Sequence, residues 1–149
     1  MFITQISVYL ENSQGTLRTL TKTLGEQGVD MLALSVADTA NFGIIRIVVR
    51  EEDVEKAISA LRANGFVAKT NHVLCIAVPN APAGLDSVLA LIEAGNISIS
   101  YMYSLNYNID NQALMVLRLS AENMEPEQIA LVLREQGVKT VTQADINRL

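Results

Sequence analysis

The stretch Leu61-Arg62-Ala63-Asn64-Gly65-Phe66 returns 72 positions later as Leu133-Arg134-Glu135-Gln136-Gly137-Val138. In both copies an apolar residue and an arginine precede an amide, a glycine and a further apolar residue. This pattern is typical of a helix that ends at glycine before a strand begins, because glycine tolerates the left-handed backbone that closes a helix. The repeat predicts that the chain contains two copies of one small unit.

Around the first copy, hydrophobic periodicity predicts the order strand, helix, strand, strand, helix, strand. Strands alternate apolar and polar residues, whereas helices place apolar residues three and four positions apart. A cluster of Asp, Asn and Gly at 38–43 predicts the turn of a hairpin. The expected strands are 3–10, 29–38, 43–50 and 66–70, and the expected helices are 16–27 and 51–64.

The same order of elements recurs in the second half. The expected strands are 73–78, 97–103, 114–119 and 138–141, the expected helices are 85–94 and 126–136, and a turn is expected at 106–111. A period near 70 residues is longer than that of solenoid repeats and suits a duplicated small domain. The alternative is a chance match of two unrelated halves, but six elements in one order with matched glycine stops favour duplication.

We therefore expect an α+β protein built from two ferredoxin-like βαββαβ units. Each unit would have an antiparallel four-stranded sheet with both helices on one face. The expected domains are 1–72 and 73–149. Because Lys69-Thr70-Asn71-His72 runs into the next apolar strand with almost no linker, we expect the two units to pack closely.

The composition excludes several classes of protein. Of the 149 residues, 50% are hydrophobic and 18% are charged, which is a globular composition. The net charge of −5 and the scattered basic residues argue against a nucleic-acid partner. The apolar stretches are shorter than the roughly 20 residues that span a bilayer, and the N-terminus lacks the pattern of a signal peptide. With one cysteine and no internal disulfide, we expect a soluble cytoplasmic protein without a membrane partner.

The chain offers little for catalysis. His72 is the only histidine, and its neighbours suggest an ordinary surface or interface residue. Cys75 lies in an apolar strand, as a small buried hydrophobe would. No zinc-protease, redox, dinucleotide or phosphate-loop motif is present, and the acidic runs at 51–53 and 122–127 fit helix N-termini. We expect no enzymatic activity, no metal and no cofactor.

A binding site is better supported, at the segment 11–17 between the first strand and its helix. Asn12 and Ser13 have side chains suited to helix capping, and Gly15 permits positive φ. The free N–H groups of a helix start suit a carboxylate, and Asp30 could accept hydrogen bonds from an ammonium group. Together they would recognise an α-amino acid. The alternative is that these residues only cap the helix.

The second copy carries a variant of this segment in Asn80-Ala81-Pro82-Ala83-Gly84-Leu85, where the glycine comes one position later. Asn96 is expected where the first copy has Asp30, and the first helix of this copy is expected to be about two residues shorter. Asn96 can both donate and accept hydrogen bonds, whereas an ionised Asp30 only accepts. The two sites need not bind alike.

At these residues the chain resembles a tandem pair of ACT domains, the small-molecule regulatory modules of amino-acid metabolism. Both copies are similar to the family motif Asn-x-Pro-Gly-x-Leu followed by Gly-x-Asn-Ile. The first copy has Gln14 in place of the proline and Asp30 in place of the asparagine, and the second has Ala83 in place of the glycine. The ligand-binding residues implied by the resemblance are Asn12, Ser13, Gln14, Gly15, Thr16, Asp30, Met31, Asn80, Ala81, Pro82, Ala83, Asn96 and Ile97.

The resemblance also implies a function. Such domains usually regulate an attached enzyme or transcription factor by binding an amino acid, often between two domains or across a dimer. This chain looks like a free-standing amino-acid-binding regulatory or sensor protein of amino-acid metabolism, a homodimer that regulates a metabolic enzyme in trans.

Two other functions remain open at this stage. One is a structural protein–protein interaction module without ligand, for which Tyr101, Tyr103 and Tyr107 could line one sheet face, although they could equally pack in the core. The other is an enzyme or an RNA binder on the same fold. The strands at 44–50 and 114–119 lack the aromatic residues expected of an RNA reader.

Overall fold

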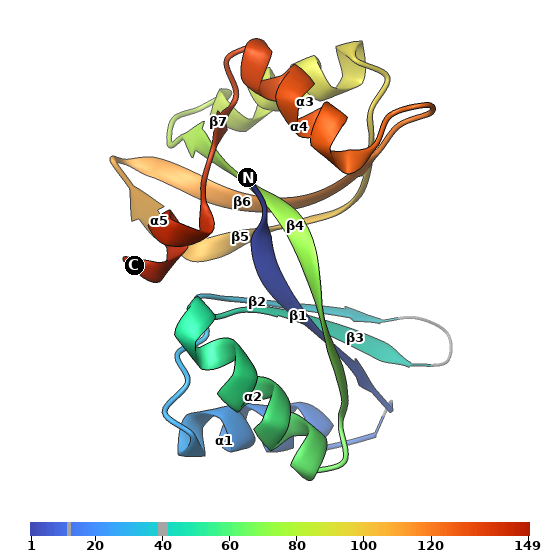
Figure 1. Cartoon of the computed structure of the whole chain (residues 1–149), viewed down its shortest axis with the longest axis vertical. Helices are drawn as coiled ribbons and strands as arrows, with labels where there is room; N and C mark the ends of the chain where they lie inside the picture. Colours follow the sequence, from blue (N-terminus) through green and yellow to red (C-terminus); the bar gives the residue numbers. More distant parts are fainter. Residues whose placement is uncertain (12, 39–41) are drawn as a thin grey trace. The chain divides into compact units, whose positions relative to one another are not determined.

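The computed structural model describes residues 1–11, 13–38 and 42–149, which form two compact units (Figure 1). One unit comprises Thr4–His72, and the other comprises Val73–Leu149 together with Met1–Ile3. We call them the N-terminal unit and the C-terminal unit. The strand β4 contributes its first residues to the N-terminal unit and its last residues to the C-terminal unit.

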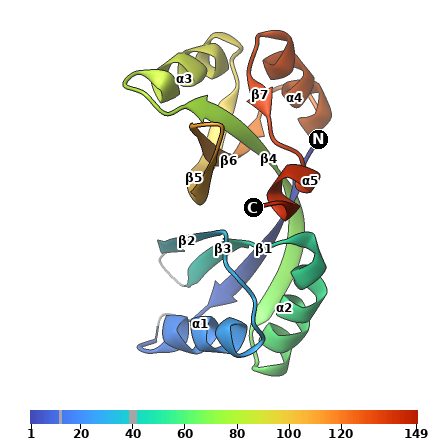
Figure 2. The same ribbon diagram turned by 90° about the vertical axis from the view of Figure 1, so that its left-hand side faces the viewer.

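The N-terminal unit has the predicted βαββαβ order. Its strands lie in the order β2-β3-β1-β4, with antiparallel pairing of β3 to both β1 and β2. Both helices cover the same face of this sheet (Figure 2). The elements are β1 (Ile3–Leu10), α1 (Thr16–Glu26), β2 (Ala33–Asp38), β3 (Gly43–Val48), α2 (Glu51–Ala63) and β4 (Val67–Pro79).

The C-terminal unit repeats this order and adds a short final helix. Here β4 pairs with β6 and β7, and β5 pairs with β6, all antiparallel. The further elements are α3 (Gly84–Ala94), β5 (Ser98–Ile109), β6 (Gln112–Ser120), α4 (Pro126–Glu135), β7 (Lys139–Thr140) and α5 (Gln143–Asn147). The α+β fold of two ferredoxin-like units is thereby confirmed.

Each unit has its own core between its helices and its sheet. In the N-terminal unit, Ile6 and Val8 of β1 pack with Leu20 and Leu24 of α1, and all four are fully buried. Burial of such a side chain contributes about 1.5–3 kcal/mol. The C-terminal core contains the corresponding buried residues Leu74, Ile76, Val78, Val88, Ile92, Leu117, Ile129, Ala130 and Leu133.

The other face of β1 carries a buried polar cluster within the N-terminal unit. Gln5 and Ser7 are 0% and 4% exposed. The Gln5 side-chain amide and the Ser7 hydroxyl each donate a hydrogen bond of 3.1 Å to the side-chain oxygen of Asn71 on β4. Asn71 therefore satisfies two polar groups that would otherwise be costly to bury.

Three sequence predictions about the strands were wrong. The separate strands expected at 66–70 and 73–78 are one strand, β4, which continues from Val67 to Pro79 without a break. The turn expected at 106–111 is shorter, since β5 continues to Ile109 and the chain reverses at Asp110 and Asn111. Their φ angles of 50° and 59° are those of a two-residue type I′ hairpin. The strand expected from residue 29 begins at Ala33.

The final helix α5 was missed. It begins with a capping box, in which the Asp145 N–H donates to the Thr142 hydroxyl at 3.2 Å and the Thr142 N–H donates to the Asp145 carboxylate at 3.0 Å. That backbone hydrogen bond holds the pKa of Asp145 below its usual value, with further contributions from the Thr142 hydroxyl and Arg148. The Thr-x-x-Asp spacing was the sequence signal for this helix.

Candidate ligand-binding site

The loop between β1 and α1 takes its shape from Gly15. Gly15 precedes the first turn of α1 with φ of 86°, which confirms the positive φ predicted for it. Its carbonyl oxygen accepts hydrogen bonds of 3.1 Å from both the N–H and the hydroxyl of Thr19. The hydroxyl groups of Ser13 and Thr16 lie 2.7 Å apart. Within the described part of the chain no side chain caps α1, so Ser13 does not have the capping role expected of it, and Asn12 lies outside the described residues.

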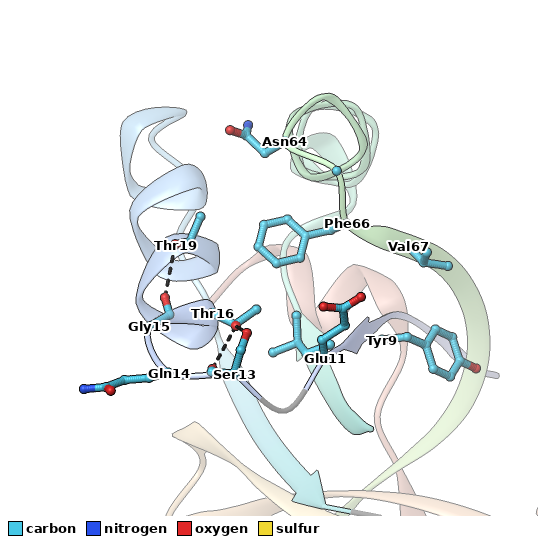
Figure 3. A pocket seen from close by; sticks show the side chains of 12 residues that line it. Tyr9, Glu11, Ser13, Gln14, Gly15, Thr16, Thr19, Asn64, Phe66 and Val67 are labelled. Atoms are coloured by element: carbon cyan, nitrogen blue, oxygen red, sulfur yellow. Dashed lines mark hydrogen bonds between the residues drawn. The ribbon is translucent and has the colours of Figure 1, made fainter. Parts of the chain in front are cut away.

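This loop forms one wall of a cleft of about 560 Å³ (Figure 3). The opposite wall comes from the end of α2 and the start of β4, where the Phe66 ring points toward α1. The Glu11 side chain also lines the cleft. Among the described lining residues Glu11 alone carries a charge. The lining residues are Tyr9, Leu10, Glu11, Ser13, Gln14, Gly15, Thr16, Thr19, Asn64, Gly65, Phe66 and Val67.

The cleft brings together four of the residues predicted for the first copy: Ser13, Gln14, Gly15 and Thr16. The Gln14 side chain points away from Phe66, out of the cleft (Figure 3). A second, smaller cleft of about 240 Å³ lies beside the same loop and is lined by Ser13, Thr16, Leu17, Val36 and Asp38, among others.

Asp30 and Met31 are not brought to this loop within the N-terminal unit. They follow the far end of α1, whose 11 residues place its two ends roughly 16 Å apart. The Asp30 carboxylate is half exposed and forms an ion pair of 3.3 Å with Arg50. Met31 packs against the core of the unit. The ammonium partner expected at Asp30 is therefore not part of this cleft.

The sequence analysis missed the residues that form the opposite wall. Asn64, Gly65 and Phe66 were identified as a repeat but not as part of a site. The Asn64 side-chain amide donates to the Ala60 carbonyl at 2.9 Å, and the Phe66 N–H donates to the Leu61 carbonyl at 3.0 Å. These bonds fix the end of α2. Its position next to the start of α1 depends on how two helices pack on a sheet, which spacing along the chain does not reveal.

The β4–α3 loop of the C-terminal unit has the same backbone geometry at an offset of 68 residues. Ala83 takes the place of Gly15, with φ of 65°. Its carbonyl accepts hydrogen bonds of 3.1 Å from the N–H and 3.0 Å from the hydroxyl of Ser87. An alanine therefore occupies the left-handed conformation that glycine has in the first loop, at an expense of roughly 1–2 kcal/mol.

The side chains of the two loops differ in chemistry. Four polar residues of the first loop have no polar counterpart in the second, whereas Asn12 corresponds to Asn80. The four pairs are Glu11 and Pro79, Ser13 and Ala81, Gln14 and Pro82, and Thr16 and Gly84. Gly84 lies so close to Pro79 that a Cβ atom on it would be 2.2 Å from the Pro79 carbonyl oxygen, whereas Gly15 has open space around it.

The expected correspondence of Asn96 with Asp30 was wrong. Asn96 has φ of 55° and precedes Ile97, whose N–H donates to the Ile92 carbonyl at 3.1 Å. Gly28 has φ of 69° and precedes Val29, whose N–H donates to the Leu24 carbonyl at 3.0 Å. Asn96 therefore corresponds to Gly28 as the residue that closes the helix. The shorter helix expected here is also absent, since α1 and α3 both have 11 residues.

Neither Cys75 nor His72 takes part in the cleft. Cys75 is fully buried, as predicted, and burial together with the negative charge of Asp145 raises the pKa of its thiol from 9.0 to about 12. His72 is exposed. Within residues 1–11, 13–38 and 42–149, no group of His, Cys, Asp and Glu could hold a metal ion, and no helix is both long and apolar enough to cross a membrane.

The repeated βαββαβ unit, with a loop that opens each first helix, defines a fold of two ferredoxin-like domains. The ACT domain pair model matches residues 1–149, and the chain belongs to this family. The chain is similar to protein BT0572 from Bacteroides thetaiotaomicron, with 34% identity, a TM-score of 0.83, and coverage of 100% of this chain and 98% of that one.

The fold is also similar to that of the regulatory subunits of aspartate kinase. For the Thermus thermophilus subunit the TM-score is 0.60 with 15% identity over 88% of each chain. For the Thermus flavus subunit the TM-score is 0.55 with 14% identity over 89% of this chain and 90% of that one. No curated protein matches this chain in sequence.

Proposed function

We propose that this ACT domain pair is an amino-acid-binding regulatory protein and that its ligand site is the cleft of the N-terminal unit. The observation that carries the proposal is the position of the cleft at the β1–α1 loop, with the Glu11 carboxylate, the Ser13 hydroxyl and the Asn64 amide among its lining groups. Its volume of about 560 Å³ lies within the usual range for small-molecule sites.

The lining groups match the two ends of an amino acid. The Glu11 carboxylate accepts hydrogen bonds from the ligand ammonium group. The Thr16 hydroxyl donates to the Ser13 carbonyl at 2.9 Å, so the donors left for the ligand carboxylate are the Ser13 hydroxyl, once it turns from Thr16, and the second N–H of the Asn64 side-chain amide. Because the cleft is open to water, each of these hydrogen bonds contributes modestly to the free energy of ligand binding. We therefore expect the Kd for the amino acid to lie in the micromolar to millimolar range.

We further propose that the C-terminal unit does not bind an amino acid at its β4–α3 loop. Pro79, Ala81 and Gly84 offer no side-chain donor or acceptor, and Gly84 packs against the backbone of Pro79. The residues predicted there, Asn80–Ala83 with Asn96 and Ile97, then have structural roles in the loop and in helix closure.

Regulation follows if the ligand binds two packing states of the protein with different affinity. A ligand shifts such an equilibrium only by this difference, and a partner that prefers one state then responds to ligand concentration. We propose a cytoplasmic homodimer that acts on a metabolic enzyme. The edge strand β2 supports an assembly, since among the described strands it pairs with β3 alone, and its Leu34 and Val36 are 38% and 56% exposed.

A thermal-shift screen of the twenty amino acids tests the proposal. A ligand at about 100 times its Kd adds about 2.7 kcal/mol to the free energy of unfolding, which raises the Tm by several degrees. We expect at least one amino acid to raise the Tm of the protein, and the same amino acid to raise the Tm of Asn64→Ala by less. In Gln136→Ala, a change at the equivalent exposed position of the C-terminal unit, the ligand is expected to raise the Tm as much as in the unaltered protein. The absence of any rise at millimolar concentrations contradicts the proposal.

A further inference from the structure

We infer that the cleft of the N-terminal unit prefers amino acids with apolar side chains over acidic ones, with Glu11 and Phe66 as the two residues that set this selectivity. The inference rests on the proposed function, because it names the ligands of the same site. Glu11 disfavours acidic ligands by charge, and Phe66 provides the surface on which an apolar side chain packs.

The charge of the cleft comes from a single group. Glu11 is the one acidic side chain among its described lining residues, and no described Lys or Arg lines the cleft. Lys69, whose ammonium lies 5.4 Å from the centre of the Tyr9 ring, is not among the lining residues. The ammonium group of any amino acid is attracted to Glu11, whereas a second carboxylate on the ligand is repelled by it and meets no cation among the described lining residues.

The apolar part of the cleft is held in place by the backbone. Gly65, with φ of 84°, turns the chain between α2 and β4 so that Phe66 points toward α1. One part of the Phe66 side chain packs against the core of the N-terminal unit, and the rest borders the cleft. Val67, which is 65% exposed, extends this apolar wall (Figure 3).

The C-terminal unit has a smaller and more deeply buried residue at the same position. The residue equivalent to Phe66 is Val138, which is 7% exposed and belongs to the core cluster of that unit. A valine suffices to close the core there. The larger and only partly buried ring of Phe66 therefore has surface beyond what the core requires, and that surface borders the cleft.

Ligand selectivity is measured by calorimetric titration of the full chain, with glutamine and glutamate as a pair of nearly equal size and different charge. We expect leucine to bind most tightly of leucine, glycine, glutamine and glutamate, because each buried methylene adds about fourfold in affinity. Glutamine is expected to bind up to about fivefold more tightly than glutamate, the effect of a solvent-exposed charge. Weak ligands are measured by displacement of leucine.

Variants of Glu11 and Phe66 separate the two roles. In Glu11→Gln the ratio of glutamine to glutamate affinity is expected to fall toward one. In Phe66→Ala the affinity for leucine is expected to fall about tenfold and that for glycine less than twofold, with an intermediate loss in Phe66→Leu, which keeps the core filled. Val138→Ala, the matched control, is expected to leave both affinities unchanged.

The outcomes distinguish this inference from the proposed function. If glutamate binds as tightly as glutamine, or if the Phe66 variants lower the affinities for leucine and glycine equally, the selectivity is wrong although amino-acid binding stands. If none of the four amino acids binds the chain, the selectivity is overturned, and the thermal-shift screen of the twenty amino acids decides whether amino-acid binding stands.

Discussion

Replacement of Gly84 by alanine tests the close packing that distinguishes the β4–α3 loop from the β1–α1 loop. Gly84 is the first residue of α3 and is buried, with no left-handed backbone angle. A Cβ atom on it would lie 2.2 Å from the carbonyl oxygen and 3.1 Å from the carbonyl carbon of Pro79. Since both atoms belong to the backbone, the loop itself must move to accept the methyl group.

The size of the effect follows from two opposing terms. Exchange of glycine for alanine in a helix normally raises stability by up to about 1 kcal/mol, because alanine restricts the unfolded chain and favours the helix. Forcing an extra carbon into a closely packed site lowers stability by about 1–3 kcal/mol. We expect Gly84→Ala to lower the free energy of unfolding by about 2 kcal/mol.

Gly25 provides the matched control within α1. A Cβ atom added to Gly25 would have no atom within 4 Å, and Gly25 has no left-handed backbone angle. At this position the substitution therefore has only the stabilising effect of replacing a helical glycine by alanine. Gly25→Ala is expected to raise the free energy of unfolding by up to about 1 kcal/mol. Urea titrations followed by far-UV circular dichroism measure both variants. If Gly84→Ala is as stable as Gly25→Ala, the close approach to Pro79 does not constrain the loop and the argument fails.

Three further predictions concern single residues, and each is checked by the same unfolding measurement. Ala83→Gly is expected to raise the free energy of unfolding by about 1 kcal/mol and Gly15→Ala to lower it by a similar amount, because both positions have positive φ. If both substitutions raise this free energy, or both lower it, the two loops do not share one backbone geometry. Asn71→Ala is expected to lower stability by about 1–3 kcal/mol, because it leaves the buried Gln5 without that partner; an unchanged stability contradicts the role given to Asn71. Burial raises the pKa of the Cys75 thiol from 9.0 to about 12. Above pH 9.0 the thiol ionises in the unfolded chain but stays neutral in the folded one, so the free energy of unfolding falls by up to about 1.4 kcal/mol per pH unit until about pH 12. Cys75→Ala is expected to lose stability less steeply over this range, and equal slopes for the two proteins refute the assignment.

Much of the fold was predictable because local pattern and tertiary structure agree in it. The alternation along β1 places Ile6 and Val8 on the helix-covered face, and the positive-φ glycines at 65 and 137 end α2 and α4 as the repeat predicted. The errors at the first helix of the second copy come from residues with unusual conformations. Asn96 and Ala83 occupy positive φ that glycine normally signals, which shifted the second copy out of alignment with the first.

The candidate site was predictable only in part. Ser13, Gly15 and Thr16 form a contiguous motif, so their presence in one wall of the cleft could be foreseen. Asn64 and Phe66 lie some 50 residues further along the chain and reach the cleft through the packing of α2 beside α1. Asp30 was placed in the site by its charge, but the length of α1 separates it from the loop in its own unit.

The most direct test of the account is the stoichiometry of amino-acid binding by the full chain. Isothermal titration calorimetry with the amino acid that gives the largest thermal shift measures the number of molecules bound per chain. The account predicts one molecule per chain, with weaker binding in Glu11→Gln. Two equivalent sites per chain, or binding that Glu11→Gln leaves unchanged, would contradict a single site in the cleft of the N-terminal unit.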